Sequence, residues 1–130
     1  MRYMLSTLVA ASLVVPSLSA QTPAQTPAAS KAVRTMATIL MNLNHYASDA
    51  DKTTLKGIAD DTSASDAERT LAQAIIGVQH QVAAADKEKL GAIAKDAKAP
   101  EDVKTIASIL LTLNHTASAA DKERLKKIAG

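Results

Sequence analysis

The sequence contains no cysteine, tryptophan or phenylalanine, and only two tyrosines among its 130 residues. Without cysteine the chain has no disulfide, no thiol nucleophile and no thiolate metal site. Beyond the first twenty residues, Tyr46 is the one aromatic side chain on which a nucleic-acid base could stack. The four glycines are scattered, which excludes a glycine-rich phosphate loop. A folded core must therefore be built from aliphatic residues and alanine.

A concentrated charge of one sign is also missing. The chain has 15 basic and 13 acidic residues and a formal net charge of +2. This near balance argues against nucleic-acid binding, which needs a strong basic field. The last segment carries Lys122, Arg124, Lys126 and Lys127. Because it lacks tryptophan and phenylalanine, it would bind a membrane surface poorly.

The N-terminus has the pattern of a secretory signal peptide. Arg2 supplies a positive charge, an apolar run follows from Met4 to Val15, and Pro16 ends it. The run is too short to span a bilayer comfortably. Small residues over 17–20 offer a cleavage site, most simply after Ala20. We expect a signal peptide over 1–20, with an uncleaved anchor as the alternative, and a bacterial periplasmic or secreted protein with no stable membrane insertion after cleavage.

Residues 21–30 repeat the string Gln-Thr-Pro-Ala and carry no charge and no large apolar side chain. Such a segment cannot bury enough surface to offset the entropy lost on ordering. We therefore expect a disordered linker of proline, alanine, glutamine and threonine over 21–30, followed by a folded domain over 31–130. Without disulfides, that domain must be held by its core alone.

The folded region repeats itself at an offset of 35 residues, which divides it into units of about 31–64, 65–99 and 100–130. Repetition this regular indicates a duplicated supersecondary unit. The identical columns are Thr35/Thr70/Thr105, Ala37/Ala72/Ala107, Asp51/Asp86/Asp121, Lys52/Lys87/Lys122, Leu55/Leu90/Leu125, Ile58/Ile93/Ile128 and Ala59/Ala94/Ala129. The unit resembles tetratricopeptide repeats in size alone, because the aromatic consensus positions of that family are missing.

Each unit has the periodicity of two helices joined by a tight turn. In the first unit, Met36, Leu40 and Leu43 follow steps of four and three, and Leu55 and Ile58 form a narrower stripe further on. We predict an all-α fold of three tandem helix hairpins of 35 residues, six helices in all. The first helix of each unit has a wide apolar arc, so we expect it to pack on its own partner and on the next unit. A compact bundle and a short α-solenoid both remain open.

The expected helix starts carry recognisable caps. Ser48 and Ser118 each precede an acidic third helical residue, whereas the middle unit has Ala83 at this place. The stretch 65–68 reads as a capping box, and Pro100 is expected at the first position of the next helix. The missing cap should weaken the middle unit by about 1 kcal/mol.

One histidine and one aspartate recur in every unit, six residues apart. They are His45, His80 and His115, with Asp51, Asp86 and Asp121. Imidazole and carboxylate together suit Zn or Cu, which gives a metal-binding hypothesis. We favour a structural hypothesis instead, in which each histidine lies in the last turn of the first helix and caps its carbonyls. In an open stack the three histidines would lie a helix pair apart, too far to share an ion.

Two further sets of residues could have a function: the repeated amides and one Ser/His/Asp set. An amide precedes each histidine, namely Asn44, Gln79 and Asn114, and falls inside the expected apolar arc. It would either contact a binding partner or, as we favour, tie down the turn by bonding its backbone. The set Ser48, His45 and Asp51 has the residue types of a hydrolase, but a nucleophile needs a converging base, and the middle unit lacks the serine. We do not expect an enzyme.

These observations predict an exported helical-repeat interaction protein of the cell envelope, with a stress-related role as a further hypothesis. Its partner would be another protein or a second copy of the chain, and no cofactor is expected. The alternative is a periplasmic metal- or small-ligand-binding protein that uses the repeated histidine and aspartate positions with Zn or Cu.

Overall fold

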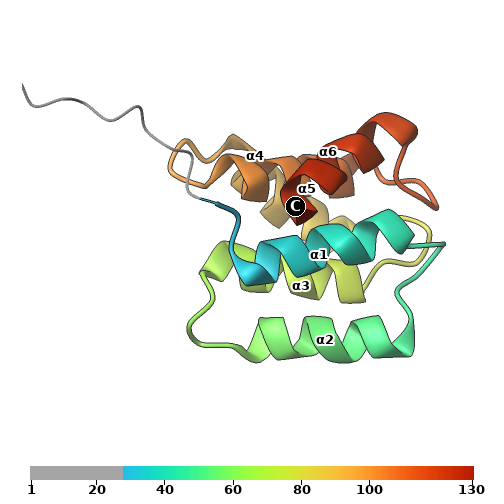
Figure 1. Ribbon diagram of the computed structural model, residues 1–130, viewed down its shortest axis with the longest axis horizontal. Coiled ribbons are helices and arrows are strands. Elements are labelled where there is room, and N and C mark those ends of the chain that lie inside the picture. The colour runs from blue at the N-terminus through green and yellow to red at the C-terminus, as the bar shows by residue number, and fades with distance from the viewer. Residues whose placement is uncertain (1–27) are drawn as a thin grey trace, which may run out of the picture.

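The computed structural model describes residues 28–130 and contains six α-helices in that range (Figure 1). They are α1 (Lys31–Asn42), α2 (Asp49–Asp60), α3 (Asp66–Ile76), α4 (Ala84–Lys95), α5 (Glu101–Thr112) and α6 (Ala119–Ala129). The predicted all-α class with six helices is confirmed. The signal peptide predicted over 1–20 and the linker residues 21–27 lie outside the described residues.

The helix starts follow the capping chemistry of the sequence. Ser48 and Ser118 accept hydrogen bonds at the starts of α2 and α6, and a full capping box opens α3. After Ala83, α4 begins without a side-chain cap. Pro100 occupies the N-cap position of α5, one place before the position that we predicted. Because proline has no N–H to satisfy, it is tolerated at either place.

The pairing of the helices differs from the expected hairpins. We call α1, α3 and α5 the A helices and α2, α4 and α6 the B helices. The most closely packed pairs are α2 with α3, α4 with α5, and α6 with α1. Each B helix thus packs mainly on the A helix that follows it, and the last B helix packs on the first A helix. Figure 1 shows α2 beside α3 at one edge of the molecule.

The connection from B to A is short enough to form a true helical hairpin. It spans 61–65 between α2 and α3 and 96–100 between α4 and α5. In the first loop Asp61 Oδ1 accepts hydrogen bonds from the backbone N–H (2.8 Å) and hydroxyl (2.6 Å) of Ser63, which lower the pKa of Asp61. In the second, Asp96 Oδ1 accepts from the N–H of Lys98 at 2.9 Å. These side-chain turns reverse the chain tightly and fix the B–A pair.

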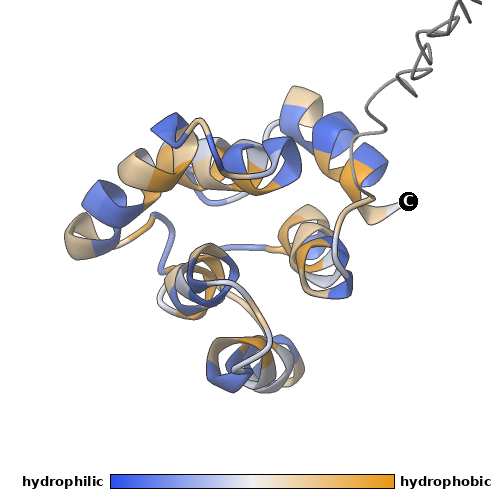
Figure 2. Ribbon diagram, turned by 90° about the vertical axis from the view of Figure 1, so that its left-hand side faces the viewer, coloured by the Kyte–Doolittle hydropathy of each residue, from blue (hydrophilic) through white to orange (hydrophobic). Residues whose placement is uncertain are grey.

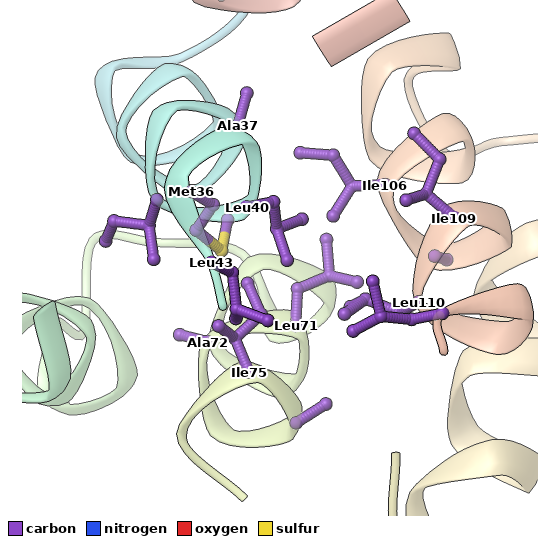
Figure 3. Close-up of a cluster of buried hydrophobic side chains, with 14 of the residues drawn as sticks. Met36, Ala37, Leu40, Leu43, Leu71, Ala72, Ile75, Ile106, Ile109 and Leu110 are labelled. Atoms are coloured by element: carbon purple, nitrogen blue, oxygen red, sulfur yellow. The ribbon is translucent and has the colours of Figure 1, made fainter. Parts of the chain in front are cut away.

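The A helices also contact one another and form the centre of the fold. Figure 3 shows their aliphatic side chains meeting from α1, α3 and α5, and Figure 2 shows the more hydrophobic faces of several helices directed inward. Residues at matching positions of the three units form buried layers. The fully buried layers are Met36/Leu71/Ile106, Ala37/Ala72/Ala107 and Leu40/Ile75/Leu110. Within 28–130, no buried residue is polar or charged.

The three units therefore close into a ring around a pseudo-threefold axis, which is the compact bundle and not the open solenoid. At one end of this axis, the N-caps of the A helices, Ser30, Ser65 and Pro100, line a common hollow of ≈ 240 Å³. The opposite end holds the connections from A to B. None of the helices described is long and apolar enough to cross a membrane.

Candidate metal centre

Each A helix ends before its histidine. The last helical residues are Asn42, Ile76 and Thr112, whereas the histidines follow three or four residues later. The expectation that each histidine lies in the last turn of the helix is therefore wrong. His45, His80 and His115, here called the histidine trio, have left-handed φ values of 67°, 67° and 62°. This region is uncommon for residues other than glycine, although histidine enters it more readily than most.

A tight backbone turn surrounds every member of the trio. The residue after the histidine donates its N–H to the carbonyl of the residue before it. These bonds join Tyr46 to Asn44 (2.8 Å), Gln81 to Gln79 (2.7 Å) and Thr116 to Asn114 (2.7 Å). An i to i+2 bond around a residue of positive φ is the pattern of the rare γ-turn. Sparsely populated backbone states cost about 1–3 kcal/mol each and persist where surrounding structure enforces them.

The surrounding structure here is a closed ring of backbone hydrogen bonds. The N–H of His45 donates to the carbonyl of His115 at 2.9 Å, that of His115 to His80 at 2.7 Å, and that of His80 to His45 at 2.8 Å. Each turn thus supplies one donor and accepts one bond, and no turn can form its bonds without the other two. The ring ties the three units together on the pseudo-threefold axis.

The same ring brings the imidazoles together. The Nδ1 atoms of the trio lie 3.2 Å (His45 to His80), 3.1 Å (His45 to His115) and 2.8 Å (His80 to His115) apart. The rings meet edge to face, with centroids 4.8–5.0 Å apart. The expectation that the histidines are too far apart to share an ion rested on an open stack, and the closed ring overturns it.

The trio lies at the boundary between the core and solvent. All three histidines are exposed. Two residues before each of them is a buried aliphatic residue: Leu43 (4% exposed), Val78 (1%) and Leu113 (5%). Two residues after each histidine a further apolar residue is buried: Ala47 (1% exposed), Val82 (4%) and Ala117 (5%). The imidazoles therefore have a hydrophobic floor on one side and water on the other.

Three neutral imidazoles cannot form a hydrogen bond between every pair of the converging Nδ1 atoms. A neutral imidazole carries one N–H and one lone pair. If one Nδ1 is protonated, it can donate toward two neighbours, but the lone pairs of those two still face each other. If two Nδ1 atoms are protonated, their N–H groups oppose each other. A cation bound by all three Nδ1 lone pairs offsets the repulsion within each pair of Nδ1 atoms.

The repeated aspartates do not belong to this cluster. Among the described residues, the histidine trio alone forms a group of metal-binding side chains whose ligand atoms lie within 4.8 Å of one another. Asp51 and Asp121 accept hydrogen bonds from the hydroxyls of Ser48 and Ser118, each at 2.7 Å. Asp86 lies 3.9 Å from the ammonium of Lys89. These carboxylates lie at the starts of the B helices, where the helix dipole stabilises negative charge.

The amides Asn44, Gln79 and Asn114 also lie outside the helices, and all three are exposed. Their expected place in the apolar arc is wrong, because the A helix ends before it reaches them. Their backbone carbonyls close the γ-turns, while their side chains form no hydrogen bond with the described residues. The turn is thus tied down by the backbone, and the amide groups stay available around the trio.

The sequence matches no protein-family model, and comparisons with curated proteins and with solved structures find no match either. Sequence reasoning found every histidine but missed their convergence. The signal was present in the 35-residue spacing, because a residue repeated once per unit meets its copies wherever it lies next to the axis of a closed ring.

Proposed function

We propose that this domain binds a transition-metal ion, Zn²⁺ first among them, through the three Nδ1 atoms of the histidine trio. The convergence of three lone-pair donors at 2.8–3.2 Å carries the proposal. Imidazole nitrogen is a common ligand of Zn²⁺, Cu²⁺ and Ni²⁺. Three protein ligands with a further position open are characteristic of many functional zinc sites.

The three Nδ1 atoms are close enough to one another to share one ion. Zn–N bonds are usually about 2.0–2.1 Å long, so His45, His80 and His115 could each supply one Nδ1 ligand to the same Zn²⁺ ion. Three ligands of a square-planar Cu²⁺ site include a trans pair about 4 Å apart. The longest Nδ1 separation here is 3.2 Å. The triangle of Nδ1 atoms is therefore too small for three ligands of a square-planar Cu²⁺ site, and it accommodates ions such as Zn²⁺ whose three ligands lie on one side.

A thermal-shift titration tests the proposal. Zn²⁺, Cu²⁺ and Ni²⁺ are added to the protein and to a variant with all three histidines changed to asparagine. Asparagine tolerates the left-handed backbone, so it removes the imidazoles with little cost to the turns. We expect Zn²⁺ to raise the Tm of the parent protein, since it binds the folded state, and to leave the variant unchanged. No shift in the parent protein, or an equal shift in both, would refute the proposal.

Export is part of the same proposal. The pattern over 1–20 supports a signal peptide, which would place the domain in the bacterial periplasm or outside the cell. N-terminal sequencing of the protein recovered from the envelope fraction tests this. A mature chain beginning near Gln21 is expected, and a chain recovered with Met1 intact in the cytoplasm would contradict it.

Protein interaction is a second candidate function. The exposed amides of Asn44, Gln79 and Asn114 support it, since each precedes a histidine of the trio and could contact another protein or a second copy. Tyr46, exposed by 62%, is the one large hydrophobic side chain exposed among residues 28–130, so a broad apolar docking face has little support. Light scattering over a concentration range tests self-association, and a strictly monomeric protein would leave only a different partner.

A further inference from the structure

We infer that a metal ion held by the histidine trio keeps one coordination face open to solvent and accepts a small monodentate nitrogen or oxygen donor there. This inference rests on the proposed metal site. The ligand class includes water, imidazole and small anions such as azide. The function that follows is reversible capture of an exogenous ligand by a protein-bound metal ion, as distinct from a purely structural metal site.

The core side of the trio offers no further ligand. The buried residues that flank the histidines two positions away are all apolar: Leu43, Val78 and Leu113 before them, and Ala47, Val82 and Ala117 after them. In the part of the chain that the structure describes, no buried residue is polar. Any donor beyond the three Nδ1 atoms must therefore come from the solvent side.

No carboxylate of the described residues closes the solvent side. The metal-binding cluster contains the three histidines and no carboxylate. The N–H and carbonyl groups of the trio are already engaged with one another in the backbone ring. Tyr46 lies beside Lys52, whose ammonium is 5.7 Å from the centre of the phenol ring, on the side of the B helix. Three nitrogens on one face of a four-coordinate ion leave at least one position for an external donor.

The histidines also lack the outer contacts that usually hold a metal ligand in place. Metal-binding histidines almost always donate the second ring N–H to a carboxylate or carbonyl group. Among the described residues, the hydrogen bonds of the trio's rings involve Nδ1 and not Nε2. With Nδ1 on the metal, each Nε2 faces water. Within the described residues, the backbone ring and not outer side-chain contacts thus positions the ligands.

Cobalt substitution tests the open face. Co²⁺ takes the place of Zn²⁺ in tetrahedral sites, and its visible d–d bands report the number and kind of its ligands. The purified protein is loaded with one equivalent of Co²⁺ and titrated with sodium azide, while equilibrium dialysis measures the Co²⁺ that stays bound. The variant with all three histidines changed to asparagine is the matched control.

We expect a saturable change of the d–d bands with azide at unchanged Co²⁺ stoichiometry, and only the spectrum of free Co²⁺ in the control. If Co²⁺ binds but its bands do not respond, the face is closed, and the inference fails while the metal site stands. Gel filtration then shows whether a second copy closes it. If azide removes the ion, the inference also fails. If Co²⁺ does not bind, the proposed function and this inference fail together.

Discussion

The two ends of the A-helix bundle differ in how far they keep the threefold repeat. At the end that carries the histidine trio, all three units have the same residue, the same positive φ and the same hydrogen bonds. At the N-cap end the units have diverged, since the three caps are Ser30, Ser65 and Pro100. A helix start needs only some way to satisfy its first N–H groups, and several residue types do so. The histidine trio lies on the pseudo-threefold axis, so it needs the same residue from each of the three units.

At the N-cap end, the second unit has a side-chain contact, made by Glu68, that the residues of the other two units cannot form. Glu68 of the second unit accepts hydrogen bonds from the backbone N–H of Ser65 at 2.8 Å and from the hydroxyl of Ser30. The matching positions in the other units hold Val33 and Val103, which are buried. One end is therefore a symmetric centre, and the other is a set of individual caps. Sequence changes at the two ends test this contrast.

Removing α6 should unfold the whole domain. In an open repeat array, a terminal unit can be lost while its neighbours stay folded. Here α6 packs on α1 and closes the ring, so its loss leaves α1 without its main partner. A chain ending at Ala117 should lose most of its helical circular dichroism at 25 °C. A truncated protein that retains the helicity of its remaining five helices would contradict the closed ring.

Single replacements in the trio should affect metal binding equally. His45→Asn, His80→Asn and His115→Asn each leave two imidazoles, and each should weaken Zn²⁺ binding by more than about 100-fold, since even loss of a supporting contact costs 10- to 100-fold. Isothermal titration calorimetry measures this. Widely different affinities among the three variants would break the threefold equivalence of this end.

Caps of the B helices offer a smaller test with a matched pair. Ala83→Ser should stabilise the protein by about 1 kcal/mol, because it supplies the cap that α4 lacks, and Ser48→Ala should destabilise it by a similar amount. Urea denaturation followed by circular dichroism measures both. Equal and opposite shifts in the midpoint, with an unchanged slope, are expected. Loss of stability in Ala83→Ser would show that the middle turn excludes a hydroxyl.

The Glu68 contact should give a weak dependence on pH that the other units lack. Burial raises the pKa of this carboxyl, but hydrogen bonds from Ser30 and Ser65 outweigh it, so the pKa lies below its ordinary value of 4.5. The charged form thus stabilises the fold above pH 4.5, and this stabilisation is lost as the pH falls through the lowered pKa. Glu68→Gln should cost less than about 1 kcal/mol at pH 7, because the site is partly exposed.

The matched control for this change is Glu101→Gln, an exposed acid in the first turn of α5 that pairs with Lys104. Thermal melts between pH 3 and pH 7 should show a flatter profile for Glu68→Gln than for the parent protein. If the Tm of Glu68→Gln depends on pH in the same way as that of the parent protein, the Glu68 contact is not the cause of the pH dependence.

Much of this fold could be predicted from local sequence signals. The periodicity of Met36, Leu40 and Leu43 indicated the A helix, and the serine caps indicated the B-helix starts. The end of the A helix could not be read in this way, because Asn44 and His45 continue a plausible helical pattern. The turn there depends on backbone bonds with two other units, and such bonds leave no mark on a single stretch of sequence.

The candidate site could not be predicted for a related reason. A repeat fixes the structure of one unit but not the rotation from one unit to the next. A small rotation gives a solenoid and separates the histidines, whereas a rotation of roughly 120° closes three copies and joins them. The rotation is set by the packing of each B helix on the following A helix, and the sequence-based expectation paired each B helix with the preceding one.

The packing of α6 on α1 means that the ring has three equivalent B–A pairs but only two connecting loops. The third pair is held without a covalent link, and Ala28 and Gly130 line the same surface hollow beside it. A peptide of about four residues, with the sequence of 61–64, would suit the gap between Gly130 and Ser30, since Ser30 takes the place that Ser65 has in the first of the existing hairpins. The backbone could then be opened within either existing loop, and the circularly permuted chain would rebuild the same ring from a different starting helix.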